Sequence, residues 1–153
     1  MISQNALLAG EESGGYAFKF HVPERDGILS SLLILELLAT SKKSLQQLKD
    51  EMYDKFGRTF FGRSDLTYTA EQSSFILNKL ENITIENIDN KTIISTSDMD
   101  GVKFYLKDKS WGTIRISGTE PLIRIYAEMP NSNLVKRALD EGQNLLFNNN
   151  FQD

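Results

Sequence analysis

Residues 111–129 read WGTIRISGTEPLIRIYAEM, and this segment carries the clearest structural signal in the chain. Trp111–Ile116 and Leu122–Met129 alternate apolar and polar residues as half-buried β-strands do. Residues 117–121, which separate the two runs, form a short polar loop that contains glycine and proline. The segment therefore predicts an antiparallel β-hairpin.

This hairpin places two arginines opposite each other. If its turn is centred directly after Thr119, Arg115 pairs with Arg124 across the ladder. Facing like charges are unfavourable unless an anion lies between them. The loop adds the hydroxyls of Ser117 and Thr119 and the backbone N–H of Gly118, so the segment predicts a phosphate-binding loop. The alternative from spacing alone is an ordinary turn with two solvated arginines.

The sequence on both sides of the hairpin predicts an antiparallel sheet with helices. Residues 59–69 are aromatic and β-prone, and Thr69 with Gln72 forms a capping-box pattern for a following helix. A last helix is expected after Pro130. Further strands are expected at Ile83–Ile88, Thr92–Thr96 and Val102–Leu106. We therefore expect residues 58–153 to form a small α+β domain.

Residues 1–57 have a different character. Asp26 can cap a helix that runs to about Thr40, and apolar residues cover nearly its whole circumference, which predicts a helix buried on several sides. Ser44 opens a second helix, which Gly57 is placed to end. Little extended chain accompanies these helices, only a strand near Ala6–Ala9 and an extended piece at Tyr16–Val22. This part therefore lacks a partner layer and is not a complete domain by itself.

A second candidate loop spans Gly10–Gly15 and contains Glu11, Glu12 and Ser13. Flanking glycines allow positive φ angles, so the loop can present its polar side chains into a cleft. Carboxylates beside a hydroxyl suit the hydroxyl groups of a sugar and would repel phosphate. The alternative is a glycine-rich turn with solvated acidic side chains.

The composition excludes several kinds of function. The 153 residues include no cysteine, which rules out thiolate zinc sites and thiol nucleophiles and does not indicate an oxidising compartment. The net charge of −4 is spread evenly and leaves no basic stripe for nucleic acid. The longest apolar run, Leu32–Leu35, is far below the ~20 residues of a membrane span, and no signal peptide is visible. We expect a cytoplasmic protein with neither a membrane nor a nucleic-acid partner.

Two further polar features are expected to be structural. Asp98–Gly101 resembles half of an acidic metal loop, but it lies between predicted strands, so a turn is the preferred interpretation. His21 is the only histidine and has no second metal-type ligand nearby. No metal site is therefore predicted in this chain.

Four motifs occur along the chain: Gly10–Tyr16, Pro23–Gly27, Asp100–Lys103, and Arg115–Pro121 with Arg124. In combination and in this order they resemble the α-D-phosphohexomutases, which include phosphoglucomutases and phosphomannomutases. The resemblance implies a fragment of a four-domain enzyme. Residues 58–153 would be its fourth, TBP-like α+β domain, and residues 1–57 a C-terminal remnant of its third, α/β domain.

The resemblance also implies roles for both loops. Glu11 and Ser13 would bind the hydroxyls of a hexose phosphate, and Arg25 falls where relatives place a basic residue near the reacting centre. The phosphate that is not transferred would be bound by Arg115, Ser117, Gly118, Thr119 and Arg124. Binding of that remote group positions the substrate for chemistry elsewhere.

The sequence departs from the family at the catalytic centre. The resemblance implies a phosphoserine loop and an aspartate-rich Mg²⁺ loop, in domains whose motifs this sequence does not contain. Such an enzyme interconverts hexose 1-phosphate and hexose 6-phosphate through a bisphosphorylated sugar. We expect this chain alone to be catalytically silent, to bind no Mg²⁺ and to associate with the missing N-terminal domains. The alternative is a non-catalytic sugar-phosphate-binding or interaction module.

Overall fold

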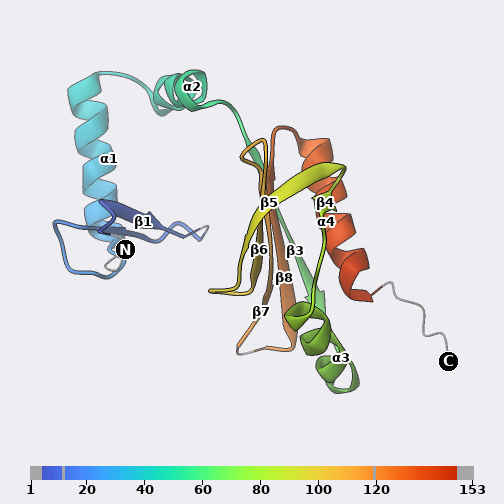
Figure 1. Cartoon of the computed structure of the whole chain (residues 1–153). Coiled ribbons are helices and arrows are strands. Elements are labelled where there is room, and N and C mark those ends of the chain that lie inside the picture. The colour runs from blue at the N-terminus through green and yellow to red at the C-terminus, as the bar shows by residue number, and fades with distance from the viewer. Residues whose placement is uncertain (1–4, 12, 119, 148–153) are drawn as a thin grey trace. The chain divides into compact units, whose positions relative to one another are not determined.

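The computed structural model describes residues 5–11, 13–118 and 120–147, and the chain divides into two units, Met1–Gly57 and Arg58–Asp153. Figure 1 follows the chain through both units from blue to red. The division falls directly after α2, where Gly57 ends the helix with a φ of 87°, a conformation that favours glycine. Each unit is described by itself below.

The second unit is built on a six-stranded antiparallel sheet with the strand order β3-β8-β7-β6-β5-β4. Its strands are β3 (Phe60–Thr67), β4 (Asn87–Ile88), β5 (Lys91–Ser97), β6 (Val102–Leu106), β7 (Trp111–Ile116) and β8 (Leu122–Met129). The strand predicted at Ile83–Ile88 is wrong over most of its length, since only Asn87–Ile88 pairs with β5. Ile83 and Ile85 instead pack against the core from the preceding loop.

The β7–β8 hairpin has the register that the sequence predicts. Arg115 lies opposite Arg124, and Ile116 lies opposite Ile123. The Ser117 amide donates a hydrogen bond to the Leu122 carbonyl oxygen at 2.8 Å and so closes the loop.

The core of this unit lies on one face of the sheet. Helices α3 (Ala70–Glu81) and α4 (Ser132–Phe147) supply Ile76 and Leu146, which are almost fully buried with Ile123 and Met129 of β8. The predicted capping box is present, since the Thr69 amide donates to Gln72 Oε1 at 2.9 Å, and the Leu134 amide donates to Asn131 Oδ1 at 2.9 Å before α4. The helices are therefore fixed at their N-termini and cover this face through their apolar sides.

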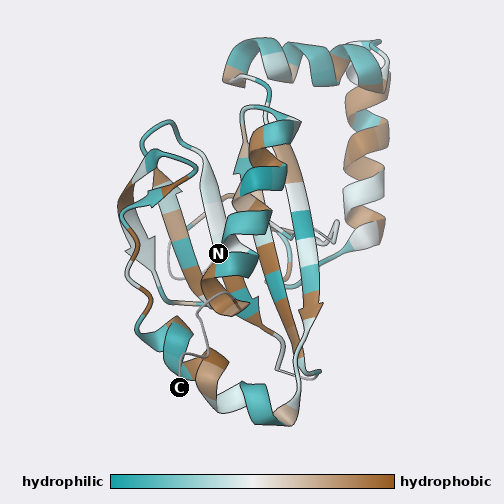
Figure 2. Cartoon of the chain, turned by 90° about the vertical axis from the view of Figure 1, so that its right-hand side faces the viewer, coloured by the Kyte–Doolittle hydropathy of each residue, from teal (hydrophilic) through white to brown (hydrophobic). Residues whose placement is uncertain are grey.

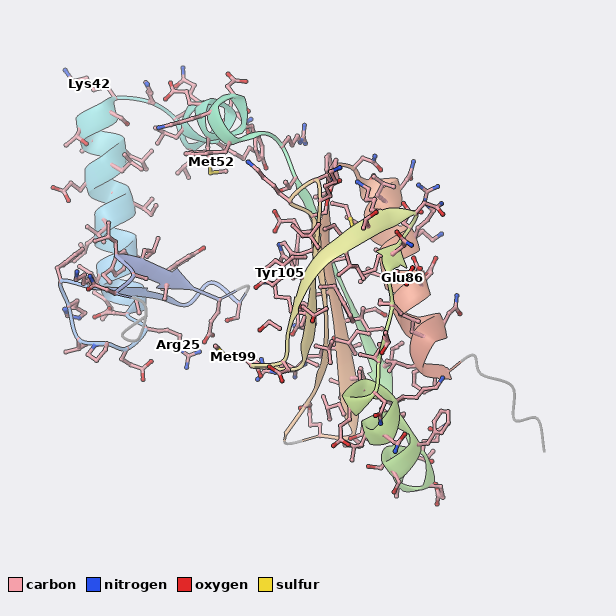
Figure 3. All side chains as sticks on the ribbon, in the orientation of Figure 1. Arg25, Lys42, Met52, Glu86, Met99 and Tyr105 are labelled. Atoms are coloured by element: carbon pink, nitrogen blue, oxygen red, sulfur yellow. The ribbon has the colours of Figure 1, made fainter. Side chains whose placement is uncertain are left out.

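The other face of the same sheet carries aromatic and charged side chains. Trp111 and Arg115 of β7 share this face with Tyr126 and Arg124 of β8, because alternate residues of a strand point to opposite faces. Figure 3 shows Tyr105 of β6 on the side of the sheet away from α4. This face carries the phosphate-loop arginines.

The first unit contains a small hairpin and two helices. Strand β1 (Leu8–Gly10) pairs with β2 (Tyr16–Phe18), and α1 (Gly27–Ser41) and α2 (Leu45–Phe56) follow. The extension of the second strand to Val22 is wrong, because the chain turns after Phe18, whose carbonyl oxygen accepts a hydrogen bond from the His21 amide. The cap of α1 and the capping box of α2 are both confirmed.

The exposure of α1 differs from what its sequence predicts. The sequence predicts a helix buried on several sides, but no residue of Gly27–Ser41 is buried. Ile28 is 77% exposed, Leu32 57% and Leu35 61%, and Figure 2 shows apolar colour along much of this helix. In the described part of this unit, the only strands are the two short ones of the hairpin, so no sheet layer covers α1.

Candidate functional site

Two arginines face each other at the loop end of the β7–β8 hairpin. Arg115 and Arg124 are direct cross-strand partners, on the face opposite the core. Arg115 Nη1 lies 3.1 Å from Asp100 Oδ2, whereas Arg124 Nη2 lies 3.9 Å from Glu120 Oε2. Each guanidinium thus has a carboxylate neighbour, and that of Arg124 is distant.

The Arg124 side chain also has an unsatisfied donor. Its Nε is buried and has no hydrogen-bond partner among the residues that the structure describes. Burying a charged N–H without an acceptor costs free energy, so an unsatisfied donor of this kind often marks the place of a ligand or ion. An anion seated between the two arginines would supply the missing acceptor once the Arg124 side chain shifts to expose its Nε.

A carboxylate on the neighbouring strand is engaged elsewhere. Asp65 of β3 lies opposite Arg124, but its oxygens accept hydrogen bonds from Arg63 Nε, at 2.7 Å, and Nη2. The Arg63 hydrogen bonds lower the pKa of Asp65, and the charge of Arg124 contributes less to this lowering. Asp65 therefore compensates Arg124 only in part, and the Nε donor of Arg124 stays without an acceptor.

The loop residues differ in how they are held. Ser117 is buried at the start of the loop, and Gly118 is exposed, with nothing within 4 Å of the position that a Cβ would occupy. The backbone beside Gly118 is therefore open to a ligand. Thr119, the remaining predicted phosphate ligand, lies outside the described residues.

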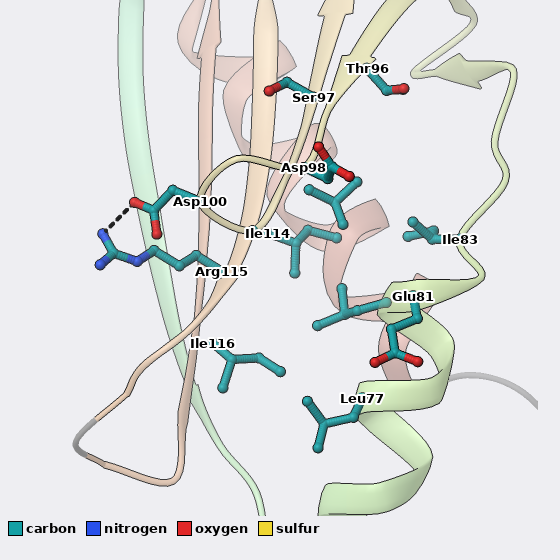
Figure 4. A pocket seen from close by; sticks show the side chains of 13 residues that line it. Leu77, Glu81, Ile83, Thr96, Ser97, Asp98, Asp100, Ile114, Arg115 and Ile116 are labelled. Atoms are coloured by element: carbon teal, nitrogen blue, oxygen red, sulfur yellow. Dashed lines mark ion pairs between the residues drawn. The ribbon is translucent and has the colours of Figure 1, made fainter. Parts of the chain in front are cut away.

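A hollow of about 740 Å³ opens beside the arginine pair, against α3 and the turn between β5 and β6 (Figure 4). Its apolar walls are Leu77, Leu80, Ile83, Val102, Ile114 and Ile116. Its other lining residues include the acidic side chains of Glu81, Asp98 and Asp100 and also Arg115 of the arginine pair. The apolar walls and acidic groups disfavour phosphate away from Arg115, so the arginine pair is the better anion site.

In the first unit, the structure brings the three predicted sugar-binding side chains together. Glu11 Oε2 lies 2.6 Å from Arg25 Nη1 and accepts a hydrogen bond from Ser13 Oγ at 3.2 Å. The loop is closed by two backbone hydrogen bonds, from the Glu11 amide to Gly15 and from the Gly14 amide to Glu11. Glu12 lies outside the described residues.

The backbone of this loop is fitted to Arg25. A Cβ on Gly15 would meet the Arg25 Cδ at 2.6 Å, so the missing side chain leaves room for the arginine to cross the loop. The Glu11 carboxylate raises the pKa of Arg25, and Arg25 in turn lowers the pKa of Glu24. Arg25 is therefore paired with carboxylates, and these residues leave no excess of positive charge.

His21 has a structural partner, as expected. Its Nε2 lies 2.9 Å from Asp26 Oδ2, and the other oxygen of Asp26 accepts a hydrogen bond from the Leu29 amide at the start of α1. The Leu29 amide, and then His21, lower the pKa of Asp26. His21 thus supports a helix cap.

Asp100 is the site residue that the sequence reasoning missed. The turn at Asp98–Gly101 was expected, but not the ion pair with Arg115. A signal existed: the β6–β7 register pairs Val102 with Ile114, and one further step places Gly101 beside Arg115.

The described residues offer no site for the Mg²⁺ that the resemblance implies for the whole enzyme. Within residues 5–11, 13–118 and 120–147, no group of three or more His, Cys, Asp or Glu side chains could hold a metal ion. In the same residues, no helix has the length and apolar character needed to cross a bilayer.

Two family models match the chain. One, described as phosphoglucomutase/phosphomannomutase, alpha/beta/alpha domain III, matches residues 1–56, and one described as phosphoglucomutase/phosphomannomutase, C-terminal domain, matches residues 79–142. The chain belongs to the phosphoglucomutase/phosphomannomutase family. The resemblance drawn from the four motifs is confirmed.

Relatives in this family align along most of the chain. A phosphoglucosamine mutase of Methanocaldococcus jannaschii is 32% identical over 95% of the chain and 31% of its own length. A phosphoglucomutase/phosphomannomutase of Thermococcus kodakarensis is 28% identical over 95% and 30%. Phosphoglucomutase-1 of Bos taurus is 30% identical over 89% and 29%. The chain thus spans about three tenths of the length of these curated relatives.

A solved structure of this family has the same fold. The phosphoglucomutase/phosphomannomutase family protein from Burkholderia thailandensis superposes with a TM-score of 0.66 at 20% identity, over 95% of this chain and 29% of that one. The expected fold class, an antiparallel sheet with helices preceded by part of an α/β domain, is confirmed.

Proposed function

We propose that this chain provides the substrate-recognition loops of a phosphohexomutase, an isomerase that interconverts hexose 1-phosphate and hexose 6-phosphate through a phosphoserine and a bisphosphorylated sugar. The β7–β8 loop binds the phosphate that is not transferred, and the Gly10–Gly15 loop binds sugar hydroxyls. Relatives are named for glucose, mannose and amino-sugar substrates. The proposal therefore extends to the hexose phosphate class and not to one sugar.

The observation that carries the phosphate assignment is the facing pair Arg115 and Arg124 with the unsatisfied Arg124 Nε. A phosphate between them accepts charge-assisted hydrogen bonds from both guanidinium groups and removes their mutual repulsion. Ser117, Gly118 and Thr119 add donors from the loop. Their order along the hairpin supports a single cradle around one phosphate.

The sugar assignment is supported by the shared contact at Glu11. Its carboxylate accepts from Ser13 and pairs with Arg25, so an acceptor and a hydroxyl of the loop meet a cation that reaches it from outside. These side chains can form hydrogen bonds with the hydroxyl groups of a sugar. They offer no excess positive charge, which makes this loop a poor site for phosphate.

We further propose that the chain recognises substrate without transferring phosphate. Transfer requires an in-line nucleophile and a cation that stabilises the moving group, and neither motif stands in this sequence. A coupled assay with glucose 1-phosphate is expected to show no turnover by this chain. Turnover that co-purifies with the chain and is lost in an Arg115→Ala variant would overturn this part of the proposal.

Binding of glucose 6-phosphate and of glucose, followed by NMR chemical shifts, tests the recognition role. The phosphorylated sugar should bind and glucose should bind far more weakly. Arg115→Ala and Arg124→Ala should each lower the affinity at least about tenfold, because a charged hydrogen bond contributes about 1.5–3 kcal/mol. Arg137→Ala is the control, since Arg137 pairs with Asp89 and lies on α4, which packs against the core face. Equal losses in all three variants would contradict the assignment.

A second candidate function, protein association, rests on α1. Ile28, Leu32 and Leu35 are each more than half exposed on one helix, and such a surface normally contacts another layer. We propose that further α/β structure of the mutase, or a second copy, covers it. Light scattering should show self-association of the chain that Leu32→Glu with Leu35→Glu reduces. A monomer at every concentration would exclude the second copy.

A further inference from the structure

The Arg115 guanidinium already has an anionic partner within this chain. Asp100 Oδ2, from the turn between β5 and β6, lies 3.1 Å from Arg115 Nη1 (Figure 4). Arg115 belongs to the proposed phosphate site, so the Asp100 carboxylate occupies part of the space where a phosphate oxygen would bind. The two anions cannot hold the same donor at once.

The position of Asp100 is fixed by the backbone. Gly101, the next residue, has a φ of +82°, and a Cβ there would meet the Ile114 carbonyl oxygen at 2.4 Å and the Arg115 Cα at 2.9 Å. Only glycine allows the turn to lie this close to β7. The carboxylate is therefore presented to Arg115 by a fitted turn rather than by a freely moving side chain.

We propose that Asp100 is an internal competitor for the phosphate site, which holds Arg115 in the absence of ligand and is displaced when phosphate binds. The inference rests on the proposed function, because it assumes that Arg115 is a phosphate ligand. The pair is solvent-exposed, with 45% of the Arg115 and 68% of the Asp100 side chain accessible, so it is weak enough to be displaced.

The competition lowers the affinity of every anion that displaces Asp100 from Arg115, and it lowers each of them by the same factor. Selectivity comes instead from the contacts that an anion makes once it is bound. A phosphate dianion bonds to Arg115 and Arg124 together and supplies an acceptor for Arg124 Nε, whereas a monoanion such as acetate replaces one carboxylate by another and gains little.

Titration of the full chain with inorganic phosphate tests the competition. Asp100→Asn should raise the phosphate affinity about two- to fivefold, the range expected for loss of an exposed ion pair. Asp98→Asn is the matched control, because it removes the same charge from the same turn, and Figure 4 shows the Asp98 side chain pointing away from Arg115. At ~0.15 M salt that remote charge is largely screened, so the control should change the affinity less than about 1.5-fold.

Two readouts separate displacement from a general charge effect. In the wild-type chain, phosphate should shift the amide resonances of Met99 to Gly101 as Asp100 leaves Arg115, and in Asp100→Asn this response should shrink. Asp100→Asn should raise the affinity for acetate and for phosphate by the same factor if Asp100 acts by displacement, whereas a general charge effect would favour the phosphate dianion. Equal phosphate affinities of Asp100→Asn and Asp98→Asn, with Arg115-dependent binding retained, would overturn the competitor role and leave the phosphate site standing. Absence of any Arg115-dependent phosphate binding would overturn the proposed function and the competitor role with it.

Discussion

The two loops use the same kinds of residue with opposite results. In the Gly10–Gly15 loop, one arginine meets one carboxylate at 2.6 Å, and the serine hydroxyl bonds to the same oxygen. In the β7–β8 hairpin, Arg115 and Arg124 face each other, and one guanidinium nitrogen lacks an acceptor. Arg25 beside the first loop is paired with carboxylates, whereas Arg124 of the hairpin keeps a donor without an acceptor.

This difference favours the β7–β8 hairpin as the anion-binding site. The first loop has its arginine paired and can offer its hydroxyl and carboxylate to neutral sugar hydroxyls. The hairpin gains more from an anion, because the anion bonds to both facing arginines and supplies an acceptor for Arg124.

The largest effect, a loss of stability, is expected at the turn between β5 and β6, where Gly101 packs against the backbone of Arg115. Gly101→Ala should destabilise the second unit by about 2–4 kcal/mol, because the added Cβ meets backbone atoms and the positive φ is strained for alanine. Gly118→Ala, in the phosphate loop itself, should cost less than about 0.5 kcal/mol, since nothing lies near its Cβ position. Urea unfolding followed by Trp111 fluorescence measures both. Equal losses would show that the turn is not fitted to Arg115.

The second prediction concerns binding. Arg115→Ala should weaken inorganic phosphate binding at least about tenfold, whereas Arg25→Ala should change it less than about twofold, because Arg25 is neutralised by Glu11. NMR titration gives both dissociation constants. A tenfold loss of phosphate affinity in Arg25→Ala would show that phosphate binds at the Gly10–Gly15 loop instead.

The third prediction concerns stability without ligand. Arg124→Met should raise the free energy of unfolding by about 0.5–1 kcal/mol in phosphate-free buffer, because it removes a repulsion and a buried unsatisfied N–H. Arg25→Met should give no such gain, because it breaks a formed ion pair. Adding phosphate should then stabilise the wild-type chain and not Arg124→Met. A less stable Arg124→Met would mean that Arg124 is already satisfied.

The smallest effect is a change in pH dependence. The hydrogen bonds from Arg63 hold the pKa of Asp65 below its ordinary 3.8. A carboxyl whose folded-state pKa is lowered contributes stability that is present above 3.8 and is lost as the pH falls through the folded value. Asp65→Asn should therefore lose less stability than the wild-type chain when the pH falls from about 4 to about 2. Parallel acid unfolding curves for the two proteins would argue against the Arg63–Asp65 pair.

The sequence predicted those features that depend on residues close together in the chain. Alternating residues and a short polar loop set the register that places Arg115 opposite Arg124. Capping residues marked the starts of the helices at Asp26 and Ser44. The two candidate loops followed from glycine, hydroxyl and charged residues within a few positions of one another.

Contacts between residues that are far apart in the sequence could not be predicted from such local patterns. Asp100 reaches Arg115 from a neighbouring hairpin, and Arg25 reaches Glu11 across 14 positions of chain. The apolar circumference of α1 predicted burial, but burial depends on a covering layer, and the described residues supply none. The isoleucines at positions 83 and 85 alternate as a strand does, yet they pack on the core without pairing.

The central claim, that the β7–β8 hairpin and not the Gly10–Gly15 loop binds phosphate, is tested most directly by one titration. Inorganic phosphate added to the ¹⁵N-labelled chain should shift the amide resonances of Ser117, Gly118 and Glu120 in a saturable way. The resonances of Glu11, Ser13 and Gly14 should stay where they are. Saturable shifts in the first loop with none in the hairpin would contradict the account.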